Sequence, residues 1–123
     1  MEVFRTVDEL ASQRIWDGVT GRAVHGKQLT LAVIDLAPGT VIPEHSHVNE
    51  QVGLLIEGSL SFRAGDETRE LAQGATWCIP AHVPHEVRVG GEGAVVVEAF
   101  SPARDDWRAL DESEQSTPRW PAG

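Results

Sequence analysis

The chain has 123 residues, of which 41% are hydrophobic and 24% charged, a composition that fits one globular domain. Its formal net charge is −9 and Lys27 is its only lysine, so we expect no nucleic-acid partner. No apolar run is long enough to cross a membrane, so we expect no membrane partner. A single cysteine, Cys78, excludes an internal disulfide and indicates a reducing, cytoplasmic location.

Turn signals built on Gly, Pro and Asp recur at short intervals along the chain. The segment 7–14 predicts a helical turn or an extended lead-in, and 104–110 predicts a short helix. Many short, evenly spaced strands indicate an all-β sandwich or barrel, here a single domain over 1–123. Runs rich in Val, Ile, Leu, Thr and Phe predict strands at 29–36, 51–56, 59–63, 76–79, 86–89 and 94–100.

Two of these strands have features that bear on packing. The run 94–100 is apolar on both faces, which predicts a central strand or a subunit interface, and from the second alternative we expect a homodimer. Cys78 follows Trp77 in the run 76–79, and we expect its side chain to be a buried apolar filler.

The histidines are the first candidate site. His45 and His47 lie on one side of an extended segment, and Gln51 has the same parity. His85 enters a strand from a proline turn further along the chain. Imidazoles that converge from two strands suit one divalent ion such as Zn, Fe, Mn, Ni or Cu. Two alternatives stay open: a pair of surface histidines on a loop, or Glu50 in place of Gln51 as fourth ligand.

The spacing of these residues follows two motifs. Gly39 is followed by five residues, then His-x-His, three residues, Gln51, six residues and Gly58; Gly74 is followed by five residues, Pro80 and then His85. This pattern resembles the two-part motif of the cupin family. The resemblance implies a double-stranded β-helix, or jelly-roll barrel, with a core at about 28–101 and a short helical or extended tail at 102–123. It also implies a metal site formed by His45, His47, Gln51 and His85.

Three positions depart from the cupin motif. Gln51 stands where most cupins have Glu, His82 occupies a small turn position, and Val89 replaces an Asn. The neutral amide of Gln51 leaves the metal site more positive than usual, which favours an anionic substrate.

A second candidate site lies near the end of the last predicted strand. Glu98 is a carboxylate within an apolar run, which is costly unless the group is paired or functional. One interpretation is a structural ion pair with an arginine. The other comes from the spacing of Glu98, Phe100 and Arg104, which resembles the D-x-F-x3-R arrangement of KdgF-like cupins of pectin and alginate breakdown. That resemblance implies ring opening of 4,5-unsaturated monouronates, an isomerase or lyase type of chemistry.

The resemblance assigns roles to these residues. Glu98 would transfer a proton, Arg104 would bind the substrate carboxylate and contribute to catalysis, and Phe100 would line the substrate pocket. Three other functions stay open for a cupin of this size. They are an Fe(II) dioxygenase, a polyketide-cyclase-like enzyme and a non-enzymatic module that binds or senses a small molecule.

Overall fold

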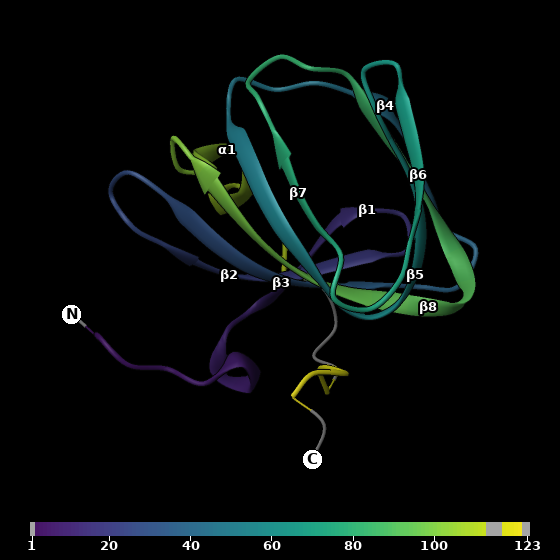
Figure 1. The fold of residues 1–123 in the computed structure, drawn as a ribbon. Helices are drawn as coiled ribbons and strands as arrows, with labels where there is room; N and C mark the ends of the chain where they lie inside the picture. The colour runs from purple at the N-terminus through teal and green to yellow at the C-terminus, as the bar shows by residue number, and fades with distance from the viewer. Residues whose placement is uncertain (1, 113–116, 122–123) are drawn as a thin grey trace.

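A computed structural model describes residues 2–112 and 117–121. Within them the strands form one antiparallel sheet in the order β1-β2-β3-β8-β5-β6, with β4 beside β8 and β7 beside β5. Figure 1 shows the sheet curving round on itself into a barrel, with the helical turn α1 at one side. The elements in chain order are a 3₁₀ helix (Val7–Glu9), β1 (Ser12–Trp16), β2 (Val19–His25), β3 (Thr30–Leu36), β4 (Val41–His45), β5 (Glu50–Ala64), β6 (Glu67–Leu71), β7 (Thr76–Ile79), β8 (His85–Ser101) and α1 (Asp105–Arg108).

The fold confirms the predicted all-β jelly roll, and two long strands form its centre. Each of β5 and β8 joins two runs that the sequence separates by glycine. The two strands pair with each other from the partners Glu50 and Ser101 at one end to Ala64 and His85 at the other. The pairing shifts register on either side of Gly58, which has φ of +90°. A methyl group on Gly58 would overlap the carbonyl of Gly93, so glycine bends the strand here without ending it.

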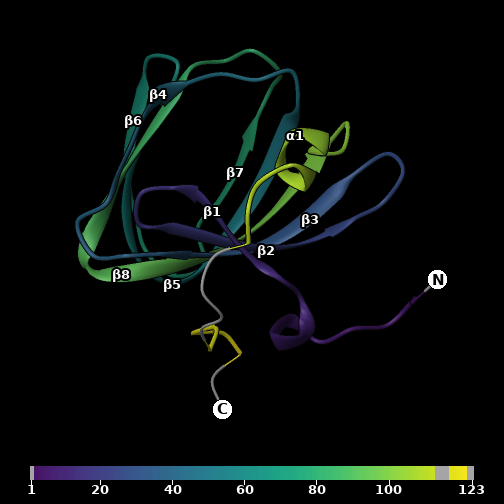
Figure 2. The same ribbon diagram turned by 180° about the vertical axis from the view of Figure 1, so that it is seen from behind.

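Four strands lie outside the predicted runs. β1 and β2 form a hairpin around the Asp17-Gly18 turn signal, so the sheet starts ahead of the expected barrel core. Figure 2 shows this hairpin from the opposite side, across the body of the barrel. β4 and β6 contain proline and charged residues that lower β-propensity, and pairing with β8 and β5 overrides that preference. The predicted short helix is present as α1.

Side chains alternate between the interior and the outer face of the barrel. Along β5, Gln51, Gly53 and Leu55 are buried whereas Val52 and Leu54 are exposed. The expectation for Cys78 was wrong: it is exposed, because Trp77 takes the inward position of β7. No helix among the described residues is long and apolar enough to span a bilayer.

Candidate metal centre and adjoining pocket

Three histidines meet at one end of the barrel. His45 ends β4, His47 follows it in the loop, and His85 begins β8 in register with His45. One ring nitrogen from each lies within 4.8 Å of those of the other two. The fold therefore brings His85 beside two histidines that are distant from it in sequence, and the three could hold a metal ion.

The histidine rings are oriented by backbone carbonyls. Nδ1 of His45 donates to the carbonyl of Pro43 at 2.8 Å, Nδ1 of His47 to Asn49 at 2.9 Å, and Nδ1 of His85 to Val83 at 2.9 Å. A carbonyl can only accept, so Nδ1 carries the proton in each neutral ring. The three Nε2 lone pairs are then free for a metal, the usual arrangement of metal-binding histidines.

His85 provides a direct test of whether these residues fit a cation. Its Nε2 is buried and has no hydrogen-bond partner among the described residues. Burial lowers the pKa of His85 to about 4 and, as the largest cause, also lowers that of His47. Both rings are therefore neutral near pH 7 and available as ligands.

Gln51 joins this cluster, and Glu50 does not. Gln51 is buried with Oε1 3.0 Å from His47 Nε2, whereas Glu50 is exposed. His47 donates its Nδ1 proton to the carbonyl of Asn49, so its Nε2 carries no proton. The two atoms that face each other, His47 Nε2 and Gln51 Oε1, are therefore both acceptors. A cation between them would satisfy both, so the donor set fits a metal ion.

Glu98 lies behind Gln51 and is buried in the barrel. Its Oε2 accepts hydrogen bonds from Gln51 Nε2 and from Trp77 Nε1, the latter at 2.9 Å. Burial is the largest influence on this carboxyl and raises its pKa, while the two hydrogen bonds and the charge of Arg104 act to lower it. The effect of desolvation on this pKa therefore exceeds the opposing effect of the Arg104 charge. The sequence left open which of the two is larger.

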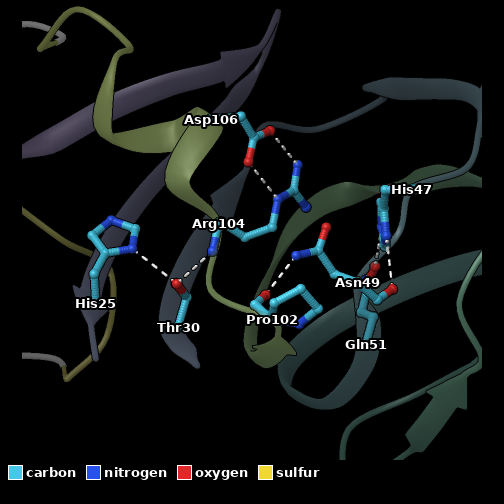
Figure 3. Close-up of polar contacts among 8 residues, drawn as sticks. All are labelled: His25, Thr30, His47, Asn49, Gln51, Pro102, Arg104 and Asp106. Carbon is cyan, nitrogen blue, oxygen red and sulfur yellow. Dashed lines mark hydrogen bonds and ion pairs between the residues drawn. The ribbon is translucent and has the colours of Figure 1, made fainter. Parts of the chain in front are cut away.

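Arg104 is held beside the pocket by two aromatic rings and a carboxylate. Its guanidinium carbon lies 4.3 Å from the Trp107 ring centre and 4.9 Å from that of Phe100. Its Nε and Nη2 bind Asp106 at 3.1 and 3.0 Å, as Figure 3 shows. The ion pair of Arg104 is thus with Asp106, and this contact lowers the pKa of Asp106.

Two further contacts bring the Arg104 segment next to the histidine loop. The backbone N–H of Arg104 donates to Thr30 Oγ1 at 2.9 Å, and Asn49 Nδ2 donates to the carbonyl of Pro102 (Figure 3). Asn49 lies between His47 and Gln51, so the loop that carries metal-type donors is tied to the segment that carries the arginine.

One pocket brings the predicted site residues together. It is lined by the three histidines and by Gln51, Glu98, Phe100 and Arg104, so every residue predicted for the site borders the same space. Phe100 also packs edge-on to Trp107 with ring centres 4.9 Å apart.

Sequence reasoning gave no site role to Trp16, Trp77, Asp106 or Trp107. The structure places the three tryptophans on the pocket and Asp106 against Arg104. For Trp77 a signal existed in Gly53, a glycine inside an apolar strand, which indicates close approach of another group.

Comparison with known proteins agrees with this architecture. The chain is 28% identical to an uncharacterized protein of Streptomyces coelicolor over 103 residues, covering 83% of this chain and 97% of that one. It is 26% identical to the pectin degradation protein KdgF of Dickeya dadantii over 102 residues, covering 81% and 93%. The structure of KdgF from Halomonas sp. superposes with a TM-score of 0.78 at 25% identity, covering 86% of this chain and 98% of that one. A family model described as cupin domain matches residues 32–100, and the chain is therefore a member of the cupin family.

Proposed function

We propose that this cupin is a metal-dependent enzyme that opens the ring of an unsaturated uronate or a closely related small anionic carbohydrate. The observation that carries the proposal is the shared pocket: a histidine cluster, a buried carboxyl and an arginine border one space. Similarity to KdgF proteins along most of the chain supports the substrate class.

One divalent ion would be held by His45, His47, Gln51 and His85, and Zn, Ni, Mn, Fe and Cu all suit these donors. When bound, the ion supplies Lewis acidity that polarises a substrate oxygen. Because Gln51 is neutral, it offsets none of the ion's charge, which favours binding of an anion.

Glu98 would carry the proton. Ring opening removes a proton from the anomeric hydroxyl, breaks the bond between the anomeric carbon and the ring oxygen, and adds a proton at the vinylic carbon. The product is a linear keto acid with the same atoms as the substrate, so neither water nor a redox partner is consumed. A buried carboxyl suits this acid–base role, because its raised pKa lies closer to neutral pH than the pKa of an ordinary glutamate.

Arg104 would bind the substrate carboxylate. Asp106 occupies the Nε and Nη2 atoms of its guanidinium and fixes its direction, so the substrate would use the remaining N–H groups. Phe100 would form the apolar wall of the pocket.

The test is turnover of a 4,5-unsaturated galacturonate or mannuronate by metal-loaded protein. Ring opening abolishes the conjugated enol ether, so its ultraviolet absorbance should fall, and the fall should stop when a chelator removes the metal. Proton NMR should identify the linear keto acid. A metal-loaded protein that leaves both uronates unchanged would contradict the proposal.

The same experiment separates the other functions that a cupin can have. Turnover should be equal in air and under nitrogen, because the reaction needs no oxidant. Consumption of oxygen would identify an oxygenase instead. Saturable binding of the uronate without turnover would identify a binding or sensing module.

A further inference from the structure

Trp77 reaches Glu98 across an intervening strand. β5 lies between β7 and β8, and Gly53 on β5 is the register partner of both Trp77 and Glu98. The indole N–H of Trp77 nevertheless donates to Glu98 Oε2 at 2.9 Å. The side chain must therefore pass over Gly53 to make this contact.

Glycine at position 53 is what allows the crossing. A methyl group there would overlap Nε1 and Cε2 of the Trp77 indole. A glycine within a strand weakens it, since glycine loses more entropy than other residues on folding. Gly53 needs no left-handed backbone, so close approach of the indole is the physical reason for glycine at this position.

The contact continues from Glu98 to the metal-type donors. The same Oε2 atom accepts from Gln51 Nε2, and Gln51 Oε1 faces His47 Nε2 at 3.0 Å. An amide has one donor end and one acceptor end, so binding its nitrogen to Glu98 directs its oxygen to the histidines. Trp77 fixes Oε2, and Oε2 in turn fixes which way the Gln51 amide points.

We propose that Trp77 is a positioning residue for the metal centre, which delivers its indole N–H over Gly53 to hold Glu98 and thereby orients the Gln51 oxygen toward the metal. The inference rests on the proposed function, because it assumes that the histidine cluster binds a metal. It adds two residues, Trp77 and Gly53, that the cupin motifs do not include.

The first test replaces Trp77 by Phe, which keeps an aromatic ring against Phe62 and removes the indole N–H donor together with the part of the indole that lies over Gly53. Apo proteins are titrated with Co²⁺, whose visible absorption depends on the number and type of ligands. Outer contacts of metal ligands typically contribute tenfold or more to affinity, so we expect about tenfold weaker Co²⁺ binding by Trp77→Phe. Its spectrum at saturation should also differ from that of the wild type. Trp120→Phe, outside the pocket, is the matched control and should behave as wild type.

The second test keeps the indole and moves it. Gly53→Ala should displace Trp77 from Glu98 and change Co²⁺ affinity and spectrum in the same direction as Trp77→Phe. Wild-type affinity and spectrum in both variants would overturn the positioning role while leaving the metal site intact. Failure of wild-type protein to bind Co²⁺, Zn²⁺ or Ni²⁺ would overturn the proposed function and the inference together.

Discussion

Glu98 is a residue whose surroundings explain an unusual proton affinity. Glu98 is 7% exposed and borders the same pocket as Arg104, and burial raises the pKa of its carboxyl. Arg104 gives two of its N–H groups to Asp106 and packs on two rings, and no ion pair joins it to Glu98 within the described part of the chain. The described residues therefore give no support to the interpretation of Glu98 as one partner of a structural ion pair.

The first prediction is the effect of Glu98→Gln. The variant keeps the shape of the side chain and loses the proton carrier, so turnover of unsaturated uronate should fall by roughly two to four orders of magnitude. The amide oxygen of the new side chain can still accept hydrogen bonds from Gln51 and Trp77, so metal content and melting temperature should stay close to wild type. Glu50→Gln, an exposed change one residue from Gln51, is the control and should retain full activity. Near wild-type turnover by Glu98→Gln would remove the acid–base assignment.

The second prediction concerns the stability of metal-free protein at low pH. The pKa of His85 is about 4 when folded and near 6.5 when unfolded, so the unfolded chain binds more protons between these values. Stability should therefore fall as the pH is lowered across this window, by about 2 kcal/mol between pH 7 and 5 from this residue. Glu98 has the opposite effect on stability. Because the pKa of its carboxyl is raised in the folded protein, stability falls as the pH rises above the ordinary pKa of a glutamate.

A comparison of variants isolates the His85 contribution. Urea unfolding with chelator present should show a smaller loss of stability from pH 7 to 5 in His85→Gln than in wild type. Equal losses in the two proteins would show that His85 does not carry this pH dependence.

At the scale of elements, the turn that leads into β8 sets the position of His85. This turn is hydrogen-bonded to the loop that carries His47, since the N–H of His82 donates to the carbonyl of His47 at 2.8 Å. His82 adopts φ of +68°, the left-handed region that a non-glycine residue enters at a cost of about 1–2 kcal/mol. A small residue at this position of the cupin motif is explained by this conformation, because it adopts a positive φ with less strain than His82 does.

The third prediction follows from that strain. His82 is exposed, so His82→Gly should lose few contacts and relieve the left-handed strain. Part of the gain is offset by the greater entropy of glycine in the unfolded chain, about 0.5–1 kcal/mol. We expect a net stabilisation of about 0.5–1 kcal/mol, measured by urea unfolding. His25→Gly, at a strand position where the side chain contacts Thr30, should instead destabilise the protein.

At the scale of the whole molecule, the outer face of the barrel is more apolar than a water-facing sheet requires. Val24 pairs with Leu31, Leu31 with Ala99, and Ala99 with Val52, which makes one row across four strands. Leu31 and Val52 are 45% and 46% exposed, and the strand apolar on both faces lies between them. Contiguous exposed apolar surface of this kind is typical of a subunit interface.

The fourth prediction is that this face forms a homodimer. Sedimentation at micromolar concentration should give the mass of two chains for wild type and of one chain for Val52→Lys, because a lysine here would bury an unpaired charge in the interface. Thr68→Lys, exposed on β6, is the control and should remain dimeric. A wild-type protein that sediments as a monomer would contradict this prediction.

The amino-acid sequence alone predicts the fold class and most of the residues that line the candidate site. Strand alternation groups His45, His47 and Gln51, and the resemblance to the cupin motif adds His85 as a further candidate metal ligand. Parity also places Glu98 and Phe100 on one face. These features depend on local geometry, which a linear pattern records directly.

Tertiary structure alone decided the contacts between strands distant in sequence. The bend at Gly58, the reach of Trp77 over Gly53 and the pairing of Arg104 with Asp106 depend on register and packing between elements. The outward position of Cys78 follows from the same cause. No linear pattern fixes strand register or the balance between burial and charge at Glu98, because both are set by neighbours from other strands.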